Sequence, residues 1–149
     1  MSERYLSAPS SKDMEAFEAM VQNVREDLQD AARSAADSVS SLLRSGDFKR
    51  AAEYVFDMVA QSILINLLEP PRKAIEFIKG RRDRFSELLE NPIFKASEKL
   101  LESFEKGNKE LFAGAMQAVE ESVIGKTSID FRYTIIKDLH CAFYKYVKS

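Results

Sequence analysis

Residues 11–47 read SKDMEAFEAMVQNVREDLQDAARSAADSVSSLLRSGD, and this stretch decides the fold. Apolar residues recur along it every three or four positions with a single break at Ser38, which is the spacing of one face of an α-helix. Ser11 is expected to cap the start of this helix, and Gly46 offers the left-handed conformation that commonly follows a helix end. The stretch therefore predicts one long helix over residues 11–45.

The apolar face of this helix is narrow, about two positions in seven, as in a coiled coil. Its second half is rich in Ala and Ser, so a partner helix can approach it closely. We expect Leu28, Ala31 and Ala35 to contact such a partner. The partner is either another helix of this chain or a second copy in a homodimer, and the sequence leaves both open.

The rest of the chain repeats this pattern of capped helices. Pro70, Pro71, Asn91-Pro92 and Gly107-Asn108 mark helix ends or starts. Together with the apolar spacing, they predict further helices over 47–68, 71–79, 81–90, 92–106, 108–125 and 127–147. We therefore expect an all-α fold of six or seven helices in a bundle or helical-hairpin array, with residues 1–10 as a flexible segment and 11–149 as one domain.

The composition excludes several classes of protein. The 149 residues are 45% hydrophobic and 31% charged, which is typical of a folded globular domain. The net charge of −2 gives no long-range attraction for nucleic acid, so no nucleic-acid partner is expected. No apolar run approaches the length of a transmembrane helix, and the first residues lack the apolar core of a secretory signal. The expected location is the cytoplasm.

The candidate chemical groups do not form a recognisable catalytic or metal-binding motif. His140 and Cys141 are the only residues of their types, and adjacent helical positions point about 100° apart, so the two cannot face each other. Carboxylates such as Glu98 and Glu102 lie on polar helix faces beside Lys, as solvated charges do. No catalytic residue, metal ligand or cofactor is therefore predicted.

One basic cluster stands out, at Lys79, Arg81, Arg82 and Arg84. Arg presents a planar fork of donors that suits a phosphate or a carboxylate. The cluster is either a solvated loop between two helices or a contact for an anion or an acidic partner protein.

Three C-terminal tyrosines lie off the apolar stripe of the last helix: Tyr133, Tyr144 and Tyr146. Tyrosine is enriched at interfaces because it buries a large ring while its hydroxyl stays hydrated. We expect these residues to belong to a protein contact surface.

The segment Gly46–Ala51, Gly-Asp-Phe-Lys-Arg-Ala, resembles the turn of a tetratricopeptide-type helical hairpin. In that family an Ala after such a turn packs closely on the preceding helix. Gly107-Asn108 echoes the turn but does not fit the family's repeat length. The resemblance implies helix–turn–helix pairs and identifies no family for the whole chain.

These observations favour a non-enzymatic protein-interaction module that acts as an adaptor, regulator or inhibitor, with self-association through the long helix as an option. One alternative is a helical bundle that binds a small ligand or lipid in a cavity lined by Phe56, Met58, Ile63 and Leu64. The other alternative is an enzyme without a recognisable motif.

Overall fold

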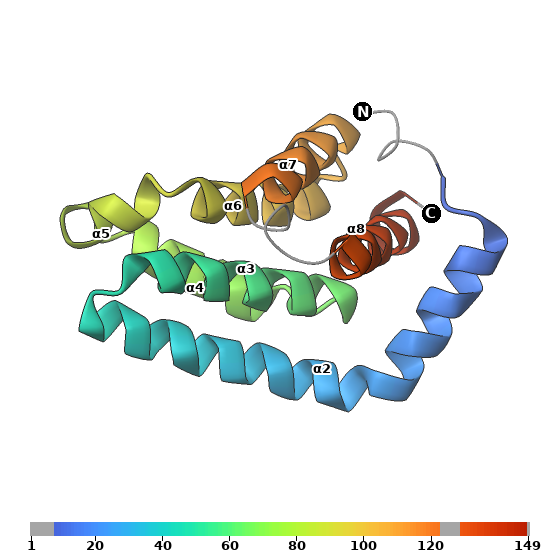
Figure 1. Cartoon of the computed structure of the whole chain (residues 1–149), viewed down its shortest axis with the longest axis horizontal. Coiled ribbons are helices and arrows are strands. Elements are labelled where there is room, and N and C mark those ends of the chain that lie inside the picture. Colours follow the sequence, from blue (N-terminus) through green and yellow to red (C-terminus); the bar gives the residue numbers. More distant parts are fainter. Residues whose placement is uncertain (1–7, 123–128, 149) are drawn as a thin grey trace.

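The computed structural model describes residues 8–122 and 129–148. These residues form seven α-helices and a closing π-helical turn, and they contain no strand, so the predicted all-α fold is confirmed (Figure 1). The elements are α2 (Ser11–Ser45), α3 (Phe48–Leu64), α4 (Glu69–Lys79), α5 (Arg82–Leu89), α6 (Pro92–Lys106), α7 (Lys109–Ser122), α8 (Ile129–Phe143) and η2 (Tyr144–Lys148).

Helix α2 has the predicted bounds, but its cap differs from the prediction. Ser10, not Ser11, is the N-cap: its backbone is extended, and its Oγ accepts a hydrogen bond of 3.1 Å from the backbone N–H of Asp13. Ser11 already has helical geometry, so it cannot fill the flanking position that a capping residue needs. At the other end Gly46 has φ 81°, the left-handed conformation expected of it.

Helix α2 is bent at Val24, where φ is −120° and ψ is 16°. Figure 1 shows the residues before the bend turning up past the end of α8, while the rest of α2 runs along α3. Phe17 is buried before the bend, and Val39 after it. The helix contains neither Pro nor Gly, so tertiary packing accounts for the bend: the two halves cover different surfaces, which a straight helix could not reach together.

The end of α3 corrects another expectation. The helix stops at Leu64, before the predicted end at 68, and Asn66 follows with φ 57°. Asn enters this left-handed region more readily than most residues, which allows the chain to turn there. Pro70 and Pro71 then lie within the first turn of α4, where a missing N–H costs no helical hydrogen bond.

The later turns follow the sequence pattern. Asn91 caps α6 by accepting a hydrogen bond of 2.8 Å on Oδ1 from the N–H of Ile93, and Gly107 follows that helix with φ 62°. The predicted end of the next helix at 125 and the predicted start of the last one at 127 lie outside the described residues.

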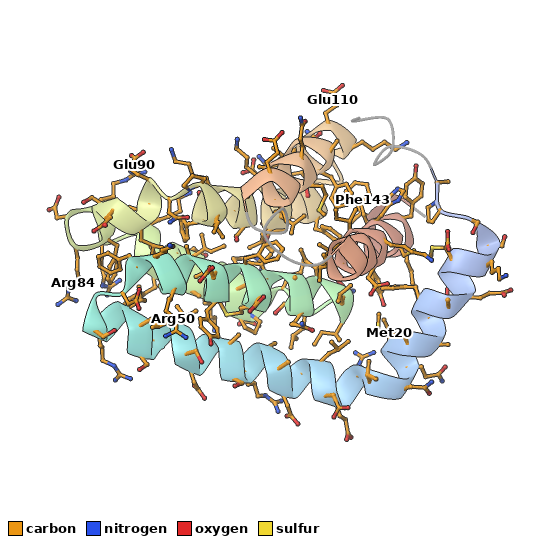
Figure 2. The ribbon with its side chains drawn as sticks, in the orientation of Figure 1. Met20, Arg50, Arg84, Glu90, Glu110 and Phe143 are labelled. Carbon is orange, nitrogen blue, oxygen red and sulfur yellow. The ribbon has the colours of Figure 1, made fainter. Side chains whose placement is uncertain are left out.

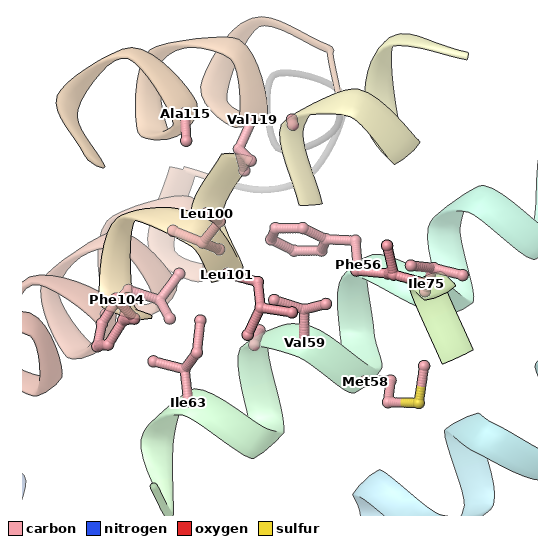
Figure 3. Close-up of a cluster of buried hydrophobic side chains, with 14 of the residues drawn as sticks. Phe56, Met58, Val59, Ile63, Ile75, Leu100, Leu101, Phe104, Ala115 and Val119 are labelled. Carbon is pink, nitrogen blue, oxygen red and sulfur yellow. The ribbon is translucent and has the colours of Figure 1, made fainter. Parts of the chain in front are cut away.

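The core is built around α3, which packs against α2, α6, α8, α5 and α4. Figure 3 shows side chains of α3 meeting those of α6 in this core, among them Phe56, Val59 and Ile63 with Leu100, Leu101 and Phe104. Each of these six is at most 6% exposed. Phe56, Ile63 and Leu64 belong to this packed cluster. Met58 points the other way, toward α2. Burying each such side chain contributes about 1.5–3 kcal/mol.

Candidate functional site: a groove between α2, α4 and α5

A groove of about 520 Å³ lies between the C-terminal half of α2, α4 and α5, over the middle of α3. Its volume is within the range of sites that take a ligand or a segment of a partner. The floor is buried, and the half-buried and exposed residues form its walls. The groove is lined by Ala36, Val39, Ser40, Leu43, Arg44, Met58, Pro70, Ala74, Phe77, Ile78, Arg84 and Phe85.

Short side chains leave this space open. Ala36 on α2 and Ala74 on α4 both line the groove, and both are half-buried. A longer apolar residue at either position would fill the hollow. Beneath them, Met58 and Ile78 are fully buried and close the floor. The result is an apolar trough with helical walls.

Phe77 forms the open edge of the groove. Its side chain is 44% exposed, and among the described residues only Leu67 is a comparably exposed large hydrophobic. Its ring packs at 6.3 Å from that of Phe85. The Arg81 guanidinium lies 3.8 Å from the Phe77 ring centroid and donates a hydrogen bond of 3.2 Å to the Phe77 carbonyl oxygen. This cation–π contact keeps the exposed ring in place.

The predicted basic cluster lies beside this groove, and its residues make different contacts. Lys79 forms an ion pair with Glu98 of α6, so it contributes to packing between helices. Arg82 and Arg84 belong to the first turn of α5, within the helix predicted over 81–90, so the loop between α4 and α5 consists of Gly80 and Arg81 only. Arg84 lines both the groove and a second hollow formed by residues 79–84, and Figure 2 shows its side chain projecting from the end of the molecule.

The predicted tyrosine surface is described in part. Tyr144 and Tyr146 are half-buried and pack against the core. The ammonium groups of Lys109 and Lys145 lie 5.6 and 5.4 Å from the respective ring centroids. Tyr133 is in α8, but its side chain lies outside the described residues. A protein contact through these tyrosines stays a prediction.

The predicted seam of α2 is largely covered by the same chain. Ala35 is 6% exposed and lies in the core, and Leu28 is half-buried against it. Ala31 is exposed. Since α3 runs along this half of α2, α3 of the same chain covers the buried part of the seam, and no second copy is needed there. A homodimer stays a prediction, for which Ala31 is the one accessible residue of the three.

His140 and Cys141 occupy different surroundings, as their adjacent helical positions require. The Cys141 thiol is 1% exposed, and burial raises its pKa to about 11, so it is protonated at neutral pH and is a poor nucleophile. The His140 ring stacks on Phe112 at 6.3 Å and meets Tyr144 edge-on at 5.2 Å. Burial also raises the pKa of the Asp138 carboxyl.

In residues 8–122 and 129–148, no group of three His, Cys, Asp or Glu could hold a metal ion, and no helix is long and apolar enough to cross a membrane.

Sequence reasoning missed Phe77 and Arg44 as site residues. Phe77 is one of several apolar residues of a short helix, and Arg44 is a charged residue in the last turn of α2, so neither stands out in the sequence. A signal was present in the run Lys-Ala-Ile-Glu-Phe-Ile-Lys over 73–79, where Phe77 lies two positions from the buried Ile75 and therefore faces away from it.

No family model matches this sequence, and comparisons with curated proteins and with solved structures also gave no match.

Proposed function

We propose that this chain is a non-enzymatic protein-interaction module that binds a helical segment of another protein in the groove between α2, α4 and α5. The observation that carries the proposal is the half-exposed Phe77 ring at the edge of an apolar groove of about 520 Å³. Exposed apolar surface that adjoins a groove is typical of a contact site. An adaptor, a regulator and an inhibitor would all use such a surface. The proposal keeps the cytoplasmic location expected from the sequence.

The shape of the groove favours a helix as the occupant. Its α2 wall runs from Ala36 to Arg44, about 12 Å of helix at 1.5 Å per residue. That length fits two to three turns of a bound helix, whose apolar side chains at every third or fourth position would enter the trough. Burying the rest of the Phe77 ring on binding would add favourable free energy, because that ring is solvated in the free protein.

A selection of displayed peptides tests the proposal. The library holds random 14-residue peptides, and the bait is the whole chain. Ala74→Arg places a long charged side chain in the groove at a half-buried position. Gln22→Arg is the matched control, with the same added charge at an exposed position before the bend of α2. Circular dichroism and thermal unfolding verify that both variants are folded.

The expected result is a set of amphipathic helical peptides that bind the wild type and Gln22→Arg alike and bind Ala74→Arg at least about tenfold more weakly. Peptides that bind all three proteins equally, or no enrichment at all, would overturn the proposal. Native mass spectrometry covers the alternative of a small ligand or lipid. A stoichiometric small molecule that accompanies the wild type and is absent from Ala74→Arg would make the groove a small-ligand site instead.

A further inference from the structure

The groove has a charge as well as a shape. Arg44 of α2 and Arg84 of α5 both line it, beside the apolar trough. Neither forms an ion pair with any described residue, whereas elsewhere Arg33, Arg72 and Lys73 all have carboxylate partners. The two guanidinium groups are therefore available to a ligand at the groove itself.

The neighbouring hollow extends this positive surface. It has a volume of about 480 Å³ and is lined by Lys79, Gly80, Arg81, Arg82, Asp83 and Arg84. Arg84 lines both concavities, so the two lie next to each other. Together they present four Arg (44, 81, 82 and 84) and one Asp, a formal charge of +3 when Lys79 is left out as the partner of Glu98. The whole chain carries −2, so this region opposes the charge of the molecule.

We propose that the segment bound in the groove is acidic: an amphipathic helix whose apolar face enters the trough while Asp or Glu side chains along its edge pair with Arg44 and Arg84. This inference rests on the proposed function and specifies the chemistry of the partner. An apolar trough selects apolar side chains, and the guanidinium groups beside it select carboxylates through paired hydrogen bonds. The exposed Arg side chains are spread over two helices, which suits charges spaced along a helix better than a single compact anion.

Charge reversal tests the inference within the same selection. The double variant Arg44→Glu/Arg84→Glu reverses the charge of the groove and leaves its apolar lining unchanged. Arg25→Glu/Lys99→Glu is the matched control, with the same change in net charge at exposed residues outside both hollows. We expect the wild type and the control to enrich peptides with Asp or Glu beside the apolar positions. The reversed groove should enrich Lys or Arg there.

Binding of one selected acidic peptide gives a quantitative readout by fluorescence anisotropy. Reversal of the two Arg should weaken it roughly tenfold or more, and the same peptide with Lys in place of Glu should prefer the reversed variant. Raised salt should weaken the wild-type complex and affect the reversed variant's complex with the acidic peptide much less.

The outcomes separate this inference from the proposed function. If groove-dependent peptides are enriched without any preference for acidic residues, the inference is wrong and the proposed function stands. If no groove-dependent peptide is enriched, both are wrong. Sedimentation with phosphatidylserine vesicles covers a different source of negative charge: vesicle binding that is lost in the reversed variant but kept in Ala74→Arg would assign the arginines to a membrane surface and overturn the inference.

Discussion

The two ends of α2 meet the rest of the molecule in opposite ways. Before the bend, Asp13 pairs with Lys137 at 2.8 Å and Glu18 with Lys145 at 3.7 Å, so the helix is joined to α8 and η2 by charges as well as by the buried Phe17. At the other end, the helix borders an open groove. We call the part of α2 before the bend, together with α8 and η2, the closed end. The C-terminal half of α2, together with the groove that it borders, is the open end.

The aromatic residues show the same contrast. At the closed end, Phe143 is fully buried, with ring centroids 4.4 Å from Phe112 and 5.3 Å from Phe104. At the open end, Phe77 leaves 44% of its side chain in water. A fully buried aromatic cluster contributes more to folding than a ring that stays half-exposed, because more of its apolar surface is removed from water. The comparison therefore assigns stability to the closed end, and the open end is where we propose that a partner binds.

Removing one aromatic ring from each end should give the largest difference. Phe143→Ala should lower the free energy of unfolding by about 3–5 kcal/mol, because it leaves a cavity among fully buried rings. Phe77→Ala should cost about 1 kcal/mol or less and should abolish binding of groove-dependent peptides. Urea denaturation followed by circular dichroism measures the first effect, and anisotropy measures the second. Equal losses of stability would contradict the division between the two ends.

Two left-handed glycines extend the comparison to the backbone. Gly46 at the open end has φ 81° with no atom within 4 Å of an added Cβ, whereas at Gly107, with φ 62°, that Cβ would lie 2.9 Å from Cγ1 of Val147 in η2. Gly46→Ala should cost about 1 kcal/mol, from the backbone conformation alone. Gly107→Ala should cost roughly 1–2 kcal/mol more, because Val147 must also move. Urea midpoints of the two variants check the order, and a larger loss for Gly46→Ala would refute it.

Local signals predicted most of the fold. The caps at Asn91 and Gly46 and the three-to-four spacing depend on residues close in sequence, so helix bounds such as 11–45 and 92–106 were predicted correctly. The bend at Val24 was not predicted, because it arises from two distant packing surfaces, α3 and α8, that no local pattern describes.

The candidate site was predicted only in part. The basic residues Arg81, Arg82 and Arg84 stood out as a run, and the structure places them at the groove end of α5. Arg44 lies 40 positions from Arg84 along the chain, so only the tertiary fold could bring them to one groove. The helical spacing indicates that Phe77 faces away from Ile75, but only the tertiary fold determines that 44% of the Phe77 side chain stays exposed.

The smallest expected effect concerns pH at the closed end. The pKa of the Asp13 carboxyl is lowered, mostly by its hydrogen bond with Lys137 and to a smaller extent by its hydrogen bond with Ser10. A carboxyl whose pKa is lower in the folded state than in the unfolded state stabilises the protein above the unfolded value, near 4, and this stabilisation is lost as the pH falls through the folded value. Asp13→Asn lacks the carboxyl, so its urea midpoint should fall less than that of the wild type between pH 6 and pH 3.

Asp37→Asn, the same change at an exposed position of α2, is the control. It should follow the wild type, because this variant still has the ion pair between Asp13 and Lys137. The raised pKa of Asp138 acts in the opposite direction, but it is common to all three proteins and cancels in the comparison. Arg44→Gln/Arg84→Gln should also follow the wild type in this assay, because it adds no group that titrates in this range and the two arginines have no carboxylate partner to lose among the described residues. If acid affected Asp13→Asn and the wild type equally, the Asp13–Lys137 pair would contribute little to the stability of the closed end, which would then rest on Phe17, the aromatic cluster and the Glu18–Lys145 pair.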